Sequence, residues 1–193
     1  MPREREFDPT AALERAMYVF WRKGYADTSI DDLVAETGVS RYGLYGTFGG
    51  KRRLYLAALD HYRDTLVTAF LDGLEAPAAG LAEVRNYFDN LIAVSETPDG
   101  RLGCLMCVTA VDLAPHDDEM AAKVRAHFTR LETALQNALA NARDRGEIGA
   151  KADPAALATF LTGIVQGGAV YGRARCDRRA IETYIDTALS VLD

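Results

Sequence analysis

The feature that most constrains the fold of this chain is the spacing of its apolar residues, which recur every three or four positions along most of its length. Such spacing places apolar side chains on one face of a helix, whereas a half-buried strand needs strict alternation of apolar and polar residues. No convincing run of alternation occurs in the 193 residues. The sequence therefore predicts an all-α protein.

Capping residues and glycines divide the first fifty positions into three short helices. Serine and aspartate are preferred at helix starts, proline is tolerated at the first helical position, and glycine often ends a helix. The expected N-caps are Asp8 (followed by Pro9), Ser29 and Ser40, and the expected stops are Gly24, Gly38 and the pair Gly49-Gly50.

The remaining sequence predicts a long helix from Lys51 and then five more. In the long helix Leu54, Ala58, Tyr62, Leu66 and Phe70 recur at spacings of four. The later helices are expected at about 81–96, 104–114, 118–145, 154–172 and 177–192. The predicted organisation is thus about nine helices: an N-terminal three-helix helix-turn-helix unit, residues 1–52, and a C-terminal helical bundle, residues 53–193.

Charge is distributed unevenly along the chain. The formal net charge is −6, yet residues 1–55 hold nine Lys/Arg and eight Asp/Glu. The excess of acidic residues therefore lies in residues 56–193. No acid occurs between Glu36 and Asp60, so a polyanionic partner should meet this stretch. The alternative is a solvated charged surface. Arg3 and Arg5 could reach DNA as an arm, but the interleaved Glu4 and Glu6 nearly cancel them.

Targeting signals and disulfides are not indicated. The chain begins without the apolar region of a secretory signal, and no apolar run approaches the roughly 18 residues that span a bilayer. Three cysteines in a chain of this length do not suggest a disulfide framework. We expect a cytoplasmic protein without a membrane partner.

The acid-free stretch coincides with two short helices joined at Gly38, which have the proportions of a helix-turn-helix. Glycine supplies the positive φ that a tight turn needs. A recognition helix needs donors for phosphates and base edges, with no acid facing the phosphates. The second helix would project Arg41, Tyr42, Tyr45 and Thr47 outward.

At this point the sequence resembles the tetracycline-repressor (TetR) family of bacterial regulators. The resemblance runs through TSIDDLVAETGVSRYGLYGTFGGKRRLYLAAL, residues 28–59, and is most specific in G-V-S-x-x-x-L-Y-x-x-F-x-x-K from Gly38 to Lys51. It implies a helical ligand-binding and dimerisation domain after the DNA-binding unit. It also implies phosphate contacts from Thr28, Tyr45 and Lys51, and base or backbone contacts from Ser40, Arg41, Tyr42 and Gly43.

The chain departs from the family pattern at Gly46, where a larger side chain is common. Gly43 and Gly46 each cost a short helix about 1 kcal/mol relative to alanine. Our hypothesis is that DNA partly orders this helix and that Arg41 and Tyr42 read most of the operator sequence.

Specific reading of DNA by one short helix requires two copies on half-sites about one helical turn apart. The last two expected helices offer an apolar dimerisation surface, and glycines such as Gly163, Gly167, Gly168 and Gly172 would permit close approach of a partner helix. Packing within the chain is the alternative for any single glycine. The expected interface residues are Leu157, Leu161, Ile164, Gly168, Tyr171, Ile181, Tyr184, Ile185 and Leu189.

A ligand pocket in such a bundle would be mostly apolar with a few polar groups. Each candidate has plain core packing as its alternative. The expected lining residues are Tyr62, Leu66, Phe70, Phe88, Ile92, Cys104, Leu105, Val108, Phe128 and Phe160.

Cys104 and Cys107 form a C-x-x-C at an expected helix start, where the helix dipole lowers a thiol pKa. They suit a thiol sensor of oxidants, electrophiles or soft metals, and the alternative is two small buried apolar residues on consecutive turns. No second C-x-x-C occurs, and His61, His116 and His127 lack ligand spacing.

The sequence thus predicts a ligand-responsive DNA-binding regulator, a repressor that binds a palindromic operator as a homodimer. Its partners would be double-stranded DNA and a small-molecule effector, and effector binding would shift the helix that begins at Lys51. The alternative is a thiol-redox or metal-sensing helical protein that acts through Cys104 and Cys107. No catalytic motif is present, so we expect no enzyme, no catalytic residue, no metal site and no cofactor.

Overall fold

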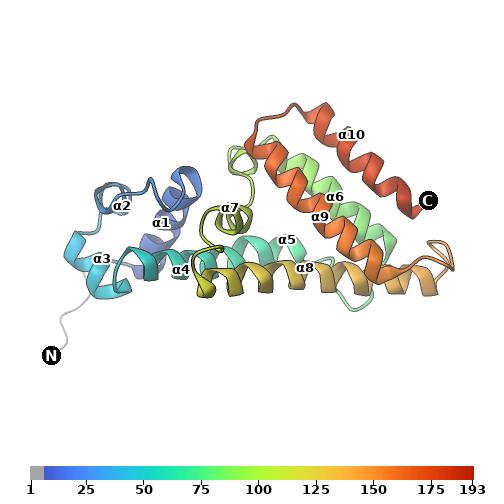
Figure 1. Ribbon diagram of the computed structural model, residues 1–193, viewed down its shortest axis with the longest axis horizontal. Helices are drawn as coiled ribbons and strands as arrows, with labels where there is room; N and C mark the ends of the chain where they lie inside the picture. The colour runs from blue at the N-terminus through green and yellow to red at the C-terminus, as the bar shows by residue number, and fades with distance from the viewer. Residues whose placement is uncertain (1–6) are drawn as a thin grey trace. The chain divides into compact units, whose positions relative to one another are not determined.

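The computed structural model describes residues 7–193, so Arg3 and Arg5 lie outside the described part. Every regular element within this part is helical and none is a strand (Figure 1), which confirms the all-α fold class. The chain divides into two compact units, one ending at Leu66 and the other running from Val67 to Asp193.

The first unit is built from four helices around an aromatic and aliphatic core. Helix α4 packs against α1 and α3, and α2 packs against α1 and α3. The Phe20 ring meets the Tyr55 ring edge-on at 4.9 Å between centroids, and both side chains are fully buried together with Leu33. The helices are α1 (Pro9–Lys23), α2 (Ile30–Thr37), α3 (Arg41–Phe48) and α4 (Lys51–Tyr62).

The contacts of α4 place it in the first unit, whereas the sequence predicts a domain boundary after residue 52. Leu54, Tyr55, Ala58 and Leu59 of α4 are buried, and α1 is the helix that α4 contacts most. The periodicity of α4 indicates which face is buried but does not tell which unit covers it.

A π-helical segment, Arg63–Val67, interrupts the helix that follows Lys51 and changes which residues face inward. A π turn inserts one extra residue into an α-helix. Tyr62 is buried, but the next buried position is Val67 and not Leu66, which is 37% exposed. The prediction that Leu66 faces inward is therefore wrong, because a spacing of four assumes an unbroken α-helix.

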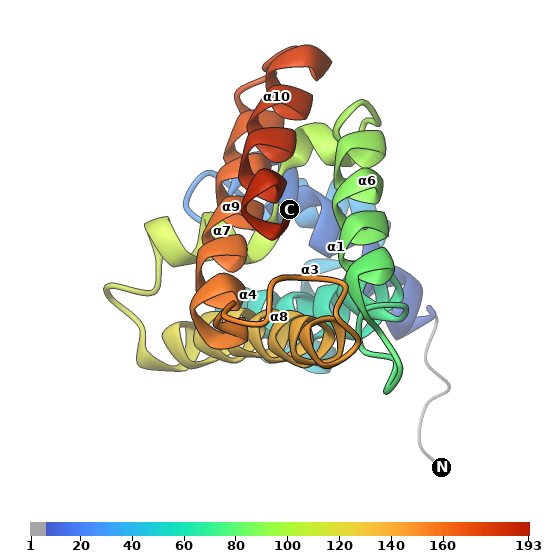
Figure 2. The same cartoon turned by 90° about the vertical axis from the view of Figure 1, so that its right-hand side faces the viewer.

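The second unit is a bundle centred on α8 and α9. Helix α9 lies on α8, and α6 and α10 both contact α9 (Figures 1 and 2). Helix α7 packs on α8 and α9. Its helices are α5 (Thr68–Leu71), α6 (Leu81–Ser95), α7 (Leu105–Asp112), α8 (Asp118–Asp144), α9 (Pro154–Arg173) and α10 (Arg178–Leu189), with 3-10 turns at Gly100–Leu102 and Ser190–Leu192.

The predicted helix starts are confirmed by their caps. The Asp117 carboxylate accepts hydrogen bonds from the first turn of α8, Asp153 does so for α9, and Asp177 accepts from the Ala180 amide at 2.8 Å. The chain is helical without a break from Lys51 to Leu71, so the ten labelled α-helices of residues 7–193 correspond to the nine expected.

Helix α9 is the one helix of the described part that is long and apolar enough, by length and composition, to cross a membrane. The sequence predicts no apolar run long enough to span a bilayer. Core helices of helical bundles pass the same test, and α9 packs against α6, α8 and α10. Only 28% of its most apolar stretch is buried within the chain, so much of this apolar surface is exposed.

Candidate DNA-binding surface

The turn between α2 and α3 consists of Gly38, Val39 and Ser40. Gly38 adopts φ +70°, the left-handed conformation that favours glycine. Val39 is buried beneath the turn. The Ser40 hydroxyl accepts a hydrogen bond from the Gly43 amide at 3.1 Å and thereby caps α3.

Helix α2 begins with a capping box. The Asp32 amide donates to the Ser29 hydroxyl at 3.0 Å, and the Ser29 amide donates to the Asp32 carboxylate at 2.9 Å. Hydrogen bonds from Lys23, then from Ser29, hold the pKa of the Asp32 carboxyl well below its usual range. The local sequence thus fixes the start of both helices of the motif.

Helix α3 presents an exposed polar and aromatic face. Tyr42 is 90% exposed, Arg41 and Tyr45 are also exposed, and Thr47 is partly exposed. Leu44, on the opposite face, is buried. This face offers hydroxyl and guanidinium donors to a partner, as the sequence predicts for a recognition helix.

An acid that the sequence does not mark as a neighbour of this helix lies beside this face. The Arg41 guanidinium donates to the Asp31 carboxylate at 2.8 Å, and both side chains are largely exposed. Asp31 lies in the first turn of α2, where its negative charge interacts favourably with the positive end of the helix dipole. The acid-free stretch from residue 37 to 59 is therefore acid-free in sequence but not in space.

Lys51 lies at the start of α4, over an aromatic ring. Its ammonium is 4.4 Å from the centre of the Tyr25 ring and 3.5 Å from the Ala26 carbonyl oxygen. Partial burial lowers the pKa of Lys51, while the charges of Asp27 and Asp32 oppose this shift. The contact with Tyr25 fixes where the lysine charge is presented.

Thr28 does not present its hydroxyl at this surface. It is buried, and its hydroxyl donates to the Gly24 carbonyl at 2.6 Å. The expected phosphate contact from Thr28 needs correction, because the hydroxyl is already used to tie α2 to the end of α1.

The two glycines of α3 have different surroundings. A Cβ atom at Gly43 would lie 2.8 Å from Cγ1 of Val39, whereas a Cβ atom at Gly46 would meet nothing within 4 Å. Gly43 is thus required by the packing of the turn. Gly46 faces open space.

The predicted ligand-pocket residues lie in different surroundings. Phe88 and Leu105 are completely buried core residues, and Ile92 is almost so. Tyr62 and Leu66 belong to the first unit and the other eight to the second. Phe160 is 44% exposed and lines a groove on α9 and α10. The prediction that Phe160 lines an interior pocket is wrong. Helical spacing does not tell which apolar face of α9 is turned toward the bundle and which toward solvent.

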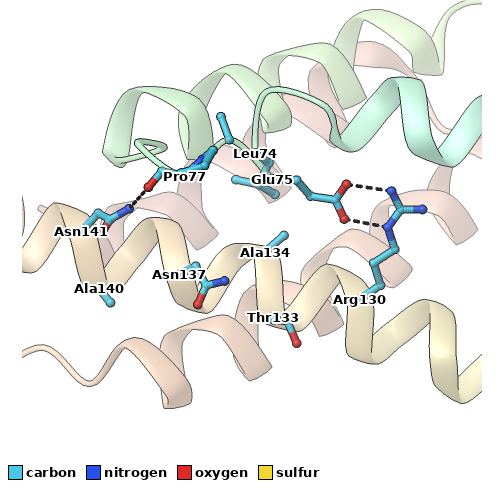
Figure 3. A pocket seen from close by; sticks show the side chains of 10 residues that line it. Leu74, Glu75, Pro77, Arg130, Thr133, Ala134, Asn137, Ala140 and Asn141 are labelled. Atoms are coloured by element: carbon cyan, nitrogen blue, oxygen red, sulfur yellow. Dashed lines mark hydrogen bonds and ion pairs between the residues drawn. The ribbon is translucent and has the colours of Figure 1, made fainter.

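A cleft of about 560 Å³ lies in the second unit between α8 and the loop after α5. Figure 3 shows Arg130 paired with the Glu75 carboxylate at one end and Asn141 bonded to the Pro77 carbonyl at the other. Asn137 lies between them. None of the predicted pocket residues lines this cleft.

The outer surface of α9 and α10 carries an apolar groove. Its exposed members include Phe160, Tyr171 and Val191, and the Tyr171 and Tyr184 rings stack with centroids 5.1 Å apart. Four predicted interface residues are instead buried within the chain. They lie on the sides of α9 and α10 that face the rest of the bundle, opposite the groove. These four are Leu161, Ile181, Ile185 and Leu189.

The glycines of α9 fall into two groups according to the space around them. A Cβ atom at Gly167 would overlap the Tyr184 hydroxyl, and one at Gly172 would lie 2.8 Å from the Gly100 carbonyl oxygen. These two glycines serve packing within the chain. Gly163 and Gly168 meet nothing within 4 Å.

The two thiols of the C-x-x-C lie among polar side chains of α8 and α9. Cys104 Sγ is 3.9 Å from Nε2 of His127, and the Cys107 thiol donates to Oε1 of Gln166 at 2.6 Å. The neighbouring Cys107 thiol, and then the His127 ring, hold the pKa of Cys104 well below the usual thiol range. The neighbouring Cys104, and then burial, raise the pKa of Cys107. Nothing in the spacing of His127 or Gln166 predicts this meeting.

These features define a class: a helix-turn-helix with an exposed donor-rich second helix, followed in the chain by a separate helical unit, is the architecture of a DNA-binding transcriptional regulator. Among residues 7–193 no three His, Cys, Asp or Glu side chains gather as metal ligands.

Comparisons with known proteins give the family. The family model for bacterial regulatory proteins of the tetR family matches residues 12–58, and that for the tetracyclin repressor-like C-terminal domain matches residues 80–188. The uncharacterized HTH-type transcriptional regulator YezE of Bacillus subtilis (strain 168) is 33% identical over the full length of both chains. The HTH-type transcriptional repressor ComR of Escherichia coli (strain K12) is 33% identical over 89% of this chain and 82% of its own.

A solved structure agrees. A cysteine mutant of the TetR family transcriptional regulator CifR, complexed with 26-bp double-strand operator DNA, has a TM-score of 0.87 and 25% identity, covering 99% of this chain and 100% of its own. The chain belongs to the TetR family of transcriptional regulators. Its class is a DNA-binding regulator and not an enzyme, and the comparisons do not favour a thiol or metal protein of another class.

Proposed function

We propose that the protein is a homodimeric, ligand-responsive repressor that binds a palindromic operator through α3. The exposed donor face of α3, within a helix-turn-helix, is the observation that carries the proposal. It is supported by two relatives: ComR is a repressor, and CifR is complexed with operator DNA. The protein would work in the cytoplasm, where the DNA of a bacterium lies.

Arg41 and Tyr42 would read base edges, because they are the exposed long side chains at the front of α3. Arg41 must then leave Asp31. An exposed ion pair contributes only about 0–1 kcal/mol, so a guanine or a phosphate can replace the carboxylate. The pair would keep the guanidinium ordered until DNA arrives.

Phosphate contacts would come from residues that flank this reading pair. Tyr45, Thr47 and Lys51 offer hydroxyl and ammonium donors, and the start of α3 at Ser40 and Gly43 offers backbone N–H groups. Thr28 is left out of this set because its hydroxyl is buried.

Dimerisation would use the groove of α9 and α10. Large exposed apolar side chains mark interaction surfaces when they are contiguous, and here they include Phe160, Tyr171 and Val191. Gly163 and Gly168, which meet nothing within the chain, would let the partner helix approach closely.

Effector binding in the second unit would lower operator affinity. A coupling free energy of about 1–3 kcal/mol corresponds to a loss of roughly 5–150-fold. The helix from Lys51 to Leu71 connects the two units through its π segment, and we infer that it carries the coupling.

The test is selection of bound fragments from a genomic or random DNA pool by the full-length protein at two salt concentrations. The expected result is a palindrome with half-sites about one turn apart, roughly 34–36 Å. Lys51→Ala should weaken binding to every sequence and flatten the salt dependence by about one unit, whereas Tyr42→Ala should relax the sequence preference. Recovery of only salt-sensitive, sequence-blind binding would refute the proposal.

A further inference from the structure

A group of polar side chains lies inside the second unit, apart from the helix-turn-helix. The Cys104 and Cys107 thiols come from the start of α7, His127 comes from α8, and Thr162 and Gln166 come from one face of α9. Cys104 and Cys107 are both residues of intermediate exposure. Helices α7, α8 and α9 pack on one another.

Three buried atoms of this group have no hydrogen-bond partner among the described residues. They are Nδ1 of His127, Oγ1 of Thr162 and Nε2 of Gln166, and the His127 and Thr162 side chains are only 7% and 9% exposed. Buried polar groups in native proteins almost always have partners, so each exception calls for an explanation. Thr162 and Gln166 are one turn apart on α9 and therefore point the same way.

Cys104 has the surroundings of a nucleophile. It occupies the N-cap position of α7, where the helix dipole favours an anion. Its sulfur is 3.9 Å from Nε2 of His127, which can take the thiol proton. Cys107 is bonded through its own thiol to the Gln166 amide at 2.6 Å, so the unpartnered nitrogen of that amide belongs to the same cluster.

We propose that Cys104 is a covalent acceptor for small soft electrophiles in which an alkene is conjugated to a carbonyl group. His127 Nε2 takes the Cys104 thiol proton, and the thiolate forms a C–S bond to the β-carbon. The alkene π electrons move toward the carbonyl oxygen as an enolate. The α-carbon then takes the proton back from His127, so the net change is addition of S–H across C=C, with no oxidant or reductant.

The unpartnered donors select this class of electrophile. An enolate oxygen develops negative charge and needs donors that are already in place. The Thr162 hydroxyl and the Gln166 amide N–H are donors of that kind, whereas a displacement at saturated carbon puts no new charge there. Both donors are on α9, so the adduct joins α7 to the helix that carries the proposed dimer surface.

The adduct would act on DNA binding through α9, a step that rests on the proposed function. Alkylation adds volume between α7 and its neighbours and disrupts the contact of the Cys104 sulfur with His127. Close-packed interiors respond to added volume by repacking. A displaced α9 would change the dimer and hence the half-site spacing.

The first experiment treats the full-length protein with 2-cyclohexen-1-one and maps adducts by peptide mass spectrometry over time. Cys176 is the internal control, because it is exposed and lies outside this group of side chains. The expected result is modification of Cys104 at least tenfold faster than Cys176, retained in Cys176→Ser and lost in Cys104→Ser. Equal or faster modification of Cys176 would overturn the proposal.

The second experiment tests the donors against a matched reagent. Thr162→Val, which is nearly isosteric, and Gln166→Met should slow the reaction of Cys104 with cyclohexenone about tenfold. They should leave its alkylation by iodoacetamide, a displacement, within twofold. Equal slowing with both reagents would mean that the side chains only control access, and the role of the donors would be refuted.

The third experiment measures operator binding of the modified protein by fluorescence anisotropy. The Cys104 adduct should weaken binding at least tenfold, and Cys104→Ser should bind normally and not respond. An unchanged affinity with a complete adduct would overturn the regulatory step alone. Failure to select any operator would instead refute the proposed function and leave the mass-spectrometric result to decide the chemistry.

Discussion

At the scale of single residues, the role of a side chain depends on its neighbours in space, which the residue type alone does not reveal. Gly43 and Gly46 look equivalent in the sequence of α3, but a side chain at Gly43 would collide with Val39 and one at Gly46 would not. Arg41 looks like a free cation, but Asp31 holds it at 2.8 Å.

The glycine pair predicts opposite stability changes from the same substitution. Gly46→Ala should raise the free energy of unfolding by about 1 kcal/mol through helix propensity. Gly43→Ala should lower it by roughly 1–3 kcal/mol, because the overlap with Val39 outweighs that gain. Urea denaturation with hydrogen exchange of the α3 amides measures both. Changes of the same sign would contradict this packing, and tighter operator binding by Gly46→Ala would support ordering of α3 by DNA.

Asp31 should restrain DNA binding. Asp31→Asn frees Arg41 and removes a negative charge next to the phosphates, so DNA affinity should rise by about threefold to fivefold, equivalent to roughly 1 kcal/mol or less. The gain should shrink as salt rises. Glu36→Gln is the matched control in the anisotropy titration, because Glu36 lies on the same helix as Asp31 and pairs with Arg22 of α1. An equal gain from both variants would show a general charge effect without a role for Arg41.

At the scale of elements, the helix from Lys51 to Leu71 shows how one extra residue changes a buried face. The π segment Arg63–Val67 keeps Tyr62 and Val67 buried at a spacing of five and turns Leu66 outward. Such insertions recur at functional sites, and this one lies where the two compact units meet in the chain.

Deletion of Leu66 should therefore be tolerated. It restores a spacing of four between Tyr62 and Val67, so the buried positions on both sides keep their faces. Far-UV circular dichroism and cooperative thermal unfolding should be retained. Deletion of Gln136, an exposed residue within regular α8, shifts every later core residue of that helix and should abolish cooperative unfolding. Equal damage from both deletions would contradict the role of the π segment.

At the scale of the whole molecule, the exposed apolar groove of α9 and α10 requires a partner surface if the proposed dimer is right. Phe160 lies on it and is 44% exposed. A carboxylate placed there would be buried in the dimer without a partner charge, and an unpaired buried charge is strongly unfavourable.

Phe160→Glu should raise the dimer dissociation constant at least ~100-fold, about 2.7 kcal/mol, and reduce operator affinity with it. Sedimentation equilibrium measures the first and anisotropy the second. Val111→Glu is the control, because Val111 is a 77% exposed apolar residue of α7 outside the groove. A Phe160→Glu protein that remains dimeric would place the interface elsewhere.

The sequence by itself determined the local features of this protein. Helix starts at Asp8, Ser29, Ser40, Asp117, Asp153 and Asp177 follow from side chains that bond their own first turn. The helix-turn-helix follows from Gly38 in the turn and from Leu33 and Leu44, which are the buried apolar residues of the two helices. These are interactions within a few residues, and their patterns are visible in a linear chain.

Only the tertiary structure decided which apolar face is core and which polar groups meet. Leu161 and Phe160 are adjacent on α9, yet one is buried and the other lies in an outer groove. Thr28 is a buried hydroxyl tied to Gly24, and His127 reaches Cys104 across 23 positions of sequence. These outcomes depend on how helices cross and on one π turn, which are properties of packing between distant segments and leave no periodic mark in the sequence.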